Sequence, residues 1–380
     1  MVKTRETATT REALPTRLGA VLAAAIALAR GGGVLALGVV VLALGVVALA
    51  PKATAATTPA NVAYVSTPEG VAVIDLATLA VTKTIDVGGN GPRGIAVTPD
   101  GRELLTANQH TADVSVIDAA TGKVLRRIHI GKNPEFMRTD RDGRTAFVTY
   151  EPSSEGGPPK KGEDEEKGGA PAEVAAVDIA AGTAHSFLAG GRETEGVEFS
   201  PDDRSIVVAN EGNDTLAIYD KSNGNLERTI DVRQWGSRPR GVKVSPDGKT
   251  WVVTLENSNN FLVFDAGFTM LKSVPTAAGP YGVAFDRSGQ HVIVAAARGS
   301  LLEIYATADW SKVASVPIGK RCWHFTFTPD DAKVIAACGR SNDLRVIDAK
   351  TWKPLTTIAN VHLPWGIVTW PKSSGSLDNP

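Results

Sequence analysis

The sequence has few of the residues and motifs on which most enzyme and metal sites depend. It contains only two cysteines, Cys322 and Cys338, and no Cys-x-x-Cys pair, which excludes a haem-attachment motif. Its six histidines show no metal-ligand spacing, and neither a Gly-x-Ser-x-Gly segment nor a P-loop is present. Local motifs therefore predict no metal site, no cofactor and no catalytic residue.

An excess of charge of one sign is also lacking. Lys and Arg total 40 against 41 for Asp and Glu, which gives a net charge of −1. Nucleic-acid-binding proteins concentrate positive charge, so this balance predicts that the chain has no nucleic-acid partner. Glycine (38) and proline (22) are abundant between short Val, Ile and Ala runs. That composition is typical of a chain that turns often and builds short strands.

The amino-terminal region differs from the rest of the chain. Basic residues precede two apolar runs, 18–29 and 33–50, and the second is long enough to cross a bilayer as a helix. A small-x-small segment at 53–55 suits signal peptidase. Residues 1–55 are therefore predicted to be a cleaved signal peptide or an uncleaved signal anchor.

Both alternatives give the same location for the remainder of the chain. The basic flank stays in the cytoplasm, so residues from 56 onward are expected in the periplasm or at the extracytoplasmic face of the inner membrane. Membrane contact is then expected only through residues 18–50.

A turn motif recurs along the chain at a nearly constant interval. The segment Thr98-Pro99-Asp100-Gly101 has counterparts whose third residues are at positions 142, 202, 247, 288 and 330. An apolar run ending in Asp marks the same units, with Tyr305 in the place of one Asp: its other copies end at 75, 118, 178, 220, 265 and 348. Seven units of about 40–45 residues are the signature of a β-propeller.

Each unit contains four short apolar segments with little alternation, as expected for strands covered on both faces. The chain enters the first unit on a second-strand segment, 61–66, and leaves on a first-strand segment, 366–370. We therefore predict an all-β, seven-bladed β-propeller over residues 56–372 that is closed by pairing of its two ends. Residues 373–380 are predicted to be a C-terminal tail.

One interval is lengthened by an insertion at 151–173. This segment contains seven acids, three lysines and nine Gly or Pro residues, but no large apolar residue. It cannot bury enough surface to order itself, so we predict a disordered acidic loop between two strands of the third blade. A docking segment for a basic partner is the alternative.

Three segments carry a resemblance to the YVTN-repeat β-propeller family: AYVS (63–66) and the longer segments 70–101 and 325–368. The likeness covers about residues 61–370 and is greatest to the subgroup associated with PQQ-dependent alcohol catabolism. It implies an exported, non-enzymatic binding or scaffold protein, accessory to a periplasmic quinone-dependent dehydrogenase system. The acidic insertion, Tyr305 and Thr67-Pro68-Glu69 depart from the family pattern and put any inherited binding preference in doubt.

Propeller ligands usually bind at the mouth of the central channel. The segments that enter the inner strands supply the following candidates for this rim: Arg93, Glu135, Glu195, Arg238, Arg240, Tyr281, Trp323, His324 and Trp365. Such a mixture of arginines and aromatics could hold a small anionic, partly planar ligand. The alternative is that these residues form surface ion pairs and cap the channel.

Three functions therefore remain open, of which binding of a tetrapyrrole or quinone cofactor at the rim is the weakest. The first is a monomeric binding or scaffold protein, whose partner is a small anionic ligand or a periplasmic protein. The second is a lactonase-like hydrolase with its site in the central channel. The second function requires Glu135 or Glu195, an arginine and His324 to converge within hydrogen-bonding distance.

The two cysteines lie on either side of a predicted hairpin. If the hairpin is centred on Asp330, residue 322 lies opposite residue 338, so a disulfide is geometrically plausible in an oxidising compartment. Two buried thiols are the main alternative, and a metal site is a lesser one.

Overall fold

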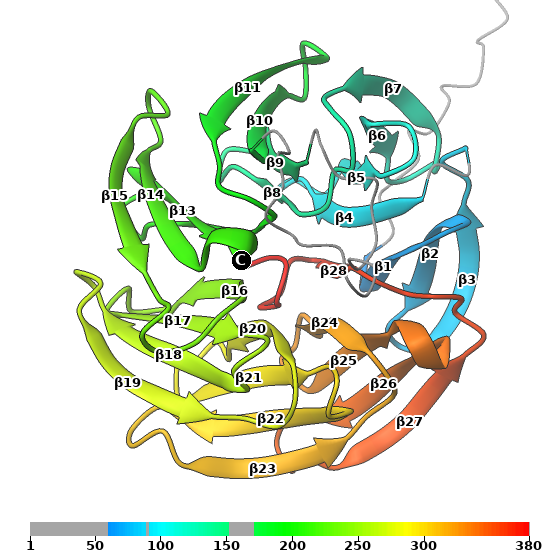
Figure 1. Ribbon diagram of the computed structural model, residues 1–380. Helices are drawn as coiled ribbons and strands as arrows, with labels where there is room; N and C mark the ends of the chain where they lie inside the picture. The colour runs from blue at the N-terminus through cyan, green and yellow to red at the C-terminus, as the bar shows by residue number, and fades with distance from the viewer. Residues whose placement is uncertain (1–59, 89–90, 152–170, 380) are drawn as a thin grey trace, which may run out of the picture. The chain divides into compact units, whose positions relative to one another are not determined.

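The chain forms seven four-stranded antiparallel sheets arranged as the blades of a ring (Figure 1). The computed structural model describes residues 60–88, 91–151 and 171–379. The numbers of sheets, strands and turns given below refer to those residues. The seven-bladed, all-β prediction is confirmed. The predicted leader (1–55) lies outside the described residues, as does 152–170 of the predicted acidic insertion.

Four consecutive strands make each blade except the first, which takes its innermost strand from the end of the chain. Blade 1 consists of β28 (Ile367–Trp370), β1 (Val62–Thr67), β2 (Gly70–Asp75) and β3 (Ala80–Ile85). Blade 2 consists of β4 (Pro92–Val97), β5 (Glu103–Asn108), β6 (Asp113–Asp118) and β7 (Val124–His129). Blade 3 consists of β8 (Met137–Thr139), β9 (Thr145–Tyr150), β10 (Glu173–Asp178) and β11 (Thr183–Ala189).

The remaining blades repeat this order. Blade 4 consists of β12 (Thr194–Phe199), β13 (Ser205–Asn210), β14 (Thr215–Asp220) and β15 (Leu226–Asp231). Blade 5 consists of β16 (Pro239–Val244), β17 (Thr250–Leu255), β18 (Asn260–Asp265) and β19 (Met270–Pro275). Blade 6 consists of β20 (Pro280–Phe285), β21 (His291–Ala296), β22 (Leu301–Ala306) and β23 (Lys312–Pro317). Blade 7 consists of β24 (Cys322–Phe327), β25 (Lys333–Cys338), β26 (Asp343–Asp348) and β27 (Pro354–Ala359).

Two short 3₁₀ turns, η1 (Glu211–Asn213) and η2 (Gly339–Ser341), follow the second strands of blades 4 and 7. No helix within the described ranges is long and apolar enough to cross a membrane.

Burial explains the apolar runs of the repeat. The second and third strands of each blade are buried almost throughout, whereas the outermost strands, such as β3, expose most of their residues. The three inner strands of a blade are therefore covered on both faces by its neighbours, and the outermost strand is not. The recurring turn is held locally: Gly101 N donates to Thr98 O at 2.8 Å, and Asp100 accepts from Arg102 N at 3.0 Å. Gly101 has a φ of 71°, a conformation that glycine adopts without strain.

The two ends of the chain close the ring as predicted. Strand β1 pairs antiparallel with β28, and Val62 lies opposite Trp370 while Val65 lies opposite Ile367. The innermost edge of blade 1 is thereby completed by the last strand, so β1 has no free edge.

The segment predicted as a C-terminal tail packs inside the ring. Phe327 N donates to Ser374 O at 2.8 Å, and Ser376 N donates to Phe325 O at 3.0 Å. The side chain of Leu377 is 1% exposed, and Asn379 Nδ2 donates to Glu198 on β12. In Figure 1 the C-terminus accordingly lies at the centre of the ring. The final residues occupy the central channel, contacting inner strands on opposite sides of it.

Candidate functional site

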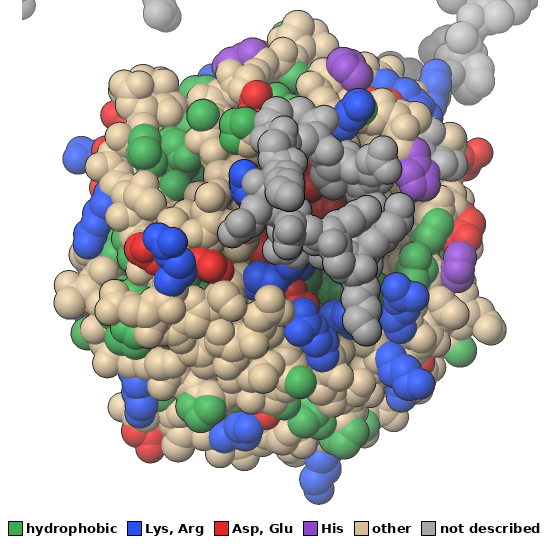
Figure 2. Space-filling view, viewed as in Figure 1, with side chains coloured by type: hydrophobic (Ala, Val, Ile, Leu, Met, Phe, Trp, Pro, Cys, Tyr) green, Lys and Arg blue, Asp and Glu red, His purple; other side chains and the backbone are tan. Residues whose placement is uncertain are grey.

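A pocket of about 590 Å³ opens at one end of the ring, where loops from all seven blades converge. Its size is within the range of about 300–1,000 Å³ usual for small-molecule sites. Two sets of loops form it: the segments that enter the innermost strands, and the turns between second and third strands. Figure 2 shows basic and acidic side chains gathered around the centre of this face.

Eight of the nine predicted rim residues line this pocket: Arg93, Glu135, Glu195, Arg238, Arg240, Tyr281, Trp323 and Trp365. His324 does not. It follows Trp323 on β24, and because successive strand residues point to opposite sides, its ring lies in a second, much smaller cavity beside Tyr281. Binding of a ligand by the eight remains a prediction.

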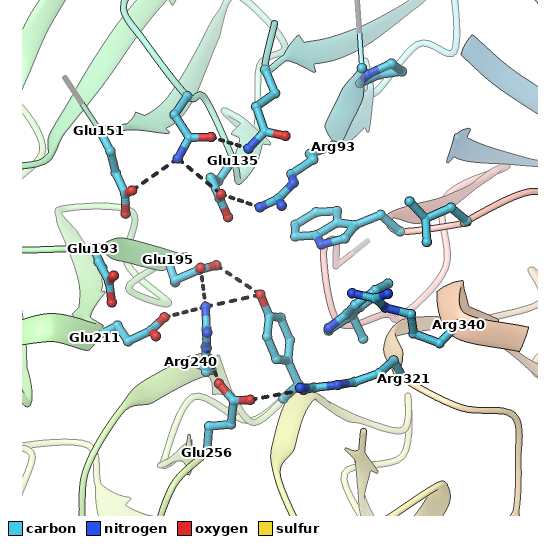
Figure 3. Close-up of a pocket in the computed structure, with 18 of the residues that line it drawn as sticks. Arg93, Glu135, Glu151, Glu193, Glu195, Glu211, Arg240, Glu256, Arg321 and Arg340 are labelled. Atoms are coloured by element: carbon cyan, nitrogen blue, oxygen red, sulfur yellow. Dashed lines mark hydrogen bonds and ion pairs between the residues drawn. The ribbon is translucent and has the colours of Figure 1, made fainter. Parts of the chain in front are cut away.

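Arg240 is the centre of an ion-pair network (Figure 3). Its guanidinium contacts Glu195 on β12 and Glu211 on η1, and its Nε lies 2.8 Å from Glu256 Oε2. Tyr281 Oη lies 3.2 Å from Arg240 Nη1 and 3.3 Å from Glu195 Oε2. Glu195, Glu211, Glu256 and Tyr281 are buried. The network is therefore a preorganised floor of the pocket and not a set of solvated surface pairs.

Further pairs continue toward blades 2 to 4. Arg238 contacts Glu211, and its Nη2 lies 3.4 Å from Glu193 Oε2. Arg93 contacts Glu135 and lies over the ring of Trp365. Carboxylates thus predominate on the side of the pocket formed by blades 3 and 4 (Figure 3).

The opposite side carries three arginines, Arg298, Arg321 and Arg340, which we call the arginine wall. Arg298 Nη2 and Arg321 Nη1 lie 2.8 and 3.4 Å from the same oxygen, Glu256 Oε1, and both side chains are about two-fifths exposed. Arg340 is exposed and has no ion pair with any residue that the structure describes. One oxygen of Glu256, a residue that also belongs to the Arg240 network, is therefore shared by two arginines of the wall, and Arg340 adds a third positive charge to the same side of the pocket.

Burial and neighbouring charges shift the pKa values of the acidic groups in the pocket floor. Burial raises the pKa of Glu195 from 4.5 to about 8; Arg240 opposes this shift, while Glu135 and Glu151 add to it. Burial also tends to raise the pKa of Glu256, but Arg240 and Arg298 outweigh it and the pKa is lowered. The pKa of Tyr281 is raised well above 10 by burial. Glu195 can consequently exchange a proton near neutral pH, whereas Glu256 remains an anion.

His324 is held below this floor. Its Nδ1 lies 3.0 Å from Ser376 Oγ of the C-terminal segment, and its Nε2 has no hydrogen-bond partner. Burial lowers its pKa to about 3, so the imidazole is neutral. Within the described part of the chain, no hydrogen bond joins His324 to Glu195, although both line the small cavity. The glutamate and the arginine required for the lactonase arrangement are in contact, but His324 lies in the small cavity and does not line the pocket.

Sequence reasoning missed the second set of loops. Residues that directly or closely follow the second strand of a blade also line the pocket: Pro68, Gln109, His110, Glu151, Glu211, Glu256, Arg298 and Arg340. Their repeat position was available from the sequence, because all except Pro68 come just after the strand that follows a Pro-Asp-Gly-type turn, and Pro68 follows the corresponding strand of the first blade. Among the described residues no group of three His, Cys, Asp or Glu side chains could hold a metal ion.

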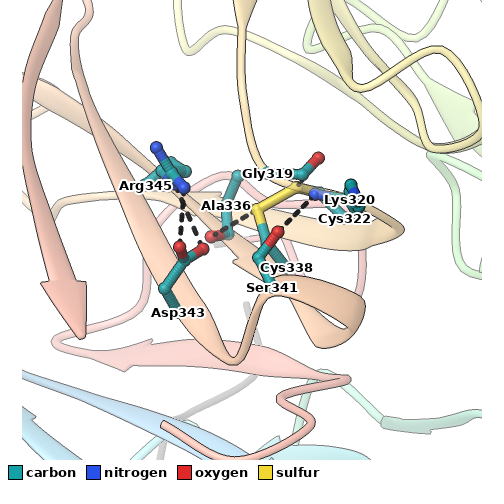
Figure 4. The surroundings of a disulfide bond; sticks show 8 residues. All are labelled: Gly319, Lys320, Cys322, Ala336, Cys338, Ser341, Asp343 and Arg345. Atoms are coloured by element: carbon teal, nitrogen blue, oxygen red, sulfur yellow. Dashed lines mark hydrogen bonds and ion pairs between the residues drawn. A yellow bond between two sulfur atoms is a disulfide. The ribbon is translucent and has the colours of Figure 1, made fainter. Parts of the chain in front are cut away.

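The two cysteines are joined by a disulfide in blade 7 (Figure 4). The expected partner is found, and the hairpin register is within one residue of the expected one. Phe325 lies opposite Ala336, one residue away from the register centred on Asp330. A bulge between Cys322 and His324 then shifts the pairing, and this places Cys322 opposite Cys338.

Comparisons with known proteins agree with the fold. The YNCE-like beta-propeller family model matches residues 40–143, and the seven-bladed beta-propeller lactonase family model matches residues 140–268. No curated protein matches the sequence. The resemblance to repeat propellers is supported at this level, while the quinone-associated subgroup remains a prediction.

Solved structures with the same fold include a functionally unknown protein from Desulfotomaculum acetoxidans, with 16% identity, a TM-score of 0.67 and coverage of 81% of this chain and 98% of that one. The periplasmic gluconolactonase of Pseudomonas aeruginosa has 20% identity, a TM-score of 0.66 and coverage of 83% and 99%. A putative 6-phosphogluconolactonase from Bacteroides uniformis has 17% identity, a TM-score of 0.63 and coverage of 81% and 99%. Identities this low establish the seven-bladed propeller class and no activity.

Proposed function

We propose that this protein is an extracytoplasmic binding protein that takes a small, hydroxyl-rich anion, such as a sugar acid, into the pocket at the propeller mouth. The observation that carries the proposal is the arginine wall, where Arg298 and Arg321 share one oxygen of Glu256. Exposed guanidinium groups with spare donors bind carboxylate or phosphate in a forked geometry. The oxygens of an anion that enters the pocket would accept hydrogen bonds from the guanidinium N–H groups of the arginine wall.

The opposite side of the pocket suits hydroxyl groups. Carboxylates such as Glu193 accept hydrogen bonds, and the partly exposed ring of Trp323 offers an apolar face to a sugar. A ligand with an anionic end and a polyhydroxyl body therefore matches both sides. The similar fold of the periplasmic gluconolactonase, whose name refers to a sugar-acid lactone, points in the same direction.

A second candidate is hydrolysis of such a lactone. It is favoured by the contact of Glu195 with Arg240 and by the pKa of about 8 for Glu195, a value suited to proton transfer near neutral pH. The lactonase family match over 140–268 supports the same idea. In this version Glu195 would be a general acid or base and Arg240 would stabilise negative charge on the lactone oxygen.

Location and partners belong to the same proposal. The leader-like segment 1–55 and the periplasmic location stated for the Pseudomonas protein support an extracytoplasmic location. A monomeric state stays a prediction. An accessory role beside a quinone-dependent dehydrogenase, or docking of a periplasmic protein on the rim, stays a prediction.

The binding proposal is tested by thermal denaturation with three probes: 6-phosphogluconate, gluconate and glucose. A ligand that binds only the native state raises its stability by RT ln(1 + [L]/Kd), so anionic probes should raise the melting temperature and glucose should not. Equal effects of glucose and gluconate, or no effect of any probe, would count against an anion site. Incubation with gluconolactone, monitored by acid release, separates the alternatives: release above the spontaneous rate that disappears in Glu195→Gln would favour the hydrolase.

A further inference from the structure

The disulfide of blade 7 lies directly behind the arginine wall. Cys322 is flanked by Arg321 and Trp323, which both line the pocket. Cys338 immediately precedes η2, which carries Arg340. The bond therefore ties together the two pocket loops of this blade (Figure 4).

The backbone around the disulfide forms one connected unit. Gly339 N donates to Arg321 O at 3.0 Å, and Arg340 N donates to Lys320 O at 3.1 Å. A Cβ on Gly339 would approach the Trp323 ring to 2.0 Å, so the indole packs directly on this backbone. A shift of either loop would move Arg321, Trp323 and Arg340 together.

In other blades, the residues that correspond to Cys322 and Cys338 face each other without a covalent bond. The strand pair bulges at this point in blades 2, 4, 5 and 6, where the facing residues are Pro92 and Asn108, Thr194 and Asn210, Pro239 and Leu255, and Pro280 and Ala296. The Thr194 hydroxyl donates to Asn210 Oδ1 at 2.9 Å. In these blades a hydrogen bond or side-chain packing is thus sufficient to hold the first and second strands together at this position.

Blade 7 differs in the charge that its loops carry. In blade 5, Arg238 and Arg240 are fixed by contacts with Glu211. In blade 7, Arg321 reaches only the shared oxygen of Glu256, and Arg340 has no ion pair with a described residue. Like charges on adjacent loops repel, and no carboxylate of this blade offsets the repulsion at the pocket.

We propose that Cys322 and Cys338 are positioning residues of the anion site: their disulfide holds Arg321 and Arg340 in place for the ligand, and anion affinity falls when it is absent. This inference rests on the proposed function for its ligand. The bond restrains the loops of blade 7 as ion pairs restrain Arg238 and Arg240 in blade 5, and it does so without occupying a guanidinium group. Preorganisation of this kind strengthens binding because less ordering accompanies association.

The test compares the oxidised full-length protein with Cys322→Ala/Cys338→Ala by calorimetric titration with 6-phosphogluconate. The variant should bind about tenfold more weakly. Val346→Ala removes buried packing from the same blade away from the pocket and is the matched control. It should bind as the wild type does, whereas a similar loss in both variants would show general loosening of the blade and overturn the inference.

A double-mutant cycle ties the effect to the arginines. In the background Arg321→Gln/Arg340→Gln, removal of the cysteines should have little further effect, because no charged groups remain to be positioned. An undiminished tenfold effect in that background would contradict a positioning role.

Hydrogen exchange provides a readout that needs no ligand. The amides of Gly339 and Arg340 donate across the disulfide-linked loops, so they should exchange at least tenfold faster in the cysteine variant while amides of blade 2 are unchanged. Unchanged exchange at 339–340 would refute the inference even if no probe binds. Faster exchange without binding of any probe to the wild type would instead refute the proposed anion function.

Discussion

Closure of the ring by the end of the chain gives the sharpest stability prediction. A chain that ends at His362 lacks β28 and the channel segment, and it therefore loses four buried apolar side chains: Trp365, Ile367, Val368 and Leu377. Burial of each such side chain contributes about 1.5–3 kcal/mol, so the loss is about 6–12 kcal/mol. The whole stability of a typical domain is only about 5–15 kcal/mol. The truncated chain should consequently fail to form a cooperative native state.

A shorter truncation is the matched control. A chain that ends at Pro371 keeps β28 and its pairing with β1, and it loses only Leu377 among the large buried side chains. Its loss from burial is about 1.5–3 kcal/mol, so it should fold with a lower unfolding midpoint. Guanidinium unfolding followed by far-ultraviolet circular dichroism measures all three chains. A chain ending at His362 with the midpoint of the full-length protein would refute the closure argument.

Two further predictions concern the layers beneath the pocket. Ser376→Ala leaves His324 Nδ1 and Phe325 N without the hydroxyl that each contacts at 3.0 Å, so it should lower the unfolding free energy by about 1–3 kcal/mol, while Ser288→Ala in an exposed turn should change it little; equal values in urea titrations would contradict the assigned contacts. The folded-state pKa of Glu195 is raised, so the folded protein keeps a proton that the unfolded chain has lost between about pH 4.5 and 8, and this contribution to stability is lost as pH rises through that window. Urea unfolding at pH 5 and pH 8 should therefore show a larger fall for the wild type than for Glu195→Gln, and parallel curves would show that Glu195 does not titrate in this way.

Much of the fold was predictable because the repeat carries several independent signals. The turn around Asp100 has five counterparts and the apolar strands recur in all seven units, so local chemistry alone indicates the repeat. The strand types at the two ends of the chain then predict the closure. Eight rim residues were also located, because the segments that enter inner strands must converge at one end of a closed ring. These inferences needed no knowledge of individual side-chain contacts.

The remaining features depend on long-range contacts that leave little trace in sequence. The segment ending in Leu377 has no strand pattern, and its position in the channel depends on backbone hydrogen bonds with Phe325 and Phe327. Lys243 looks like a surface lysine in sequence, yet it is 1% exposed and its Nζ lies 3.1 Å from Glu198 Oε2. His324 was also predicted to lie on the rim. Adjacent residues of a strand point to opposite sides, so an error of one position is enough to assign the wrong side chain to the pocket.

The arginine wall is the basis of the functional account, and calorimetric titration with 6-phosphogluconate tests it most directly. Replacing Arg321 and Arg340 together by glutamine removes two charged donors, each worth about 1.5–3 kcal/mol, so affinity should fall at least about a hundredfold. Arg102→Gln alters an arginine whose side chain is 82% exposed in a turn outside the pocket, and it should bind as the wild type does. Undiminished binding by the Arg321 and Arg340 variant, or an equal loss in Arg102→Gln, would contradict an anion site at the mouth of this propeller.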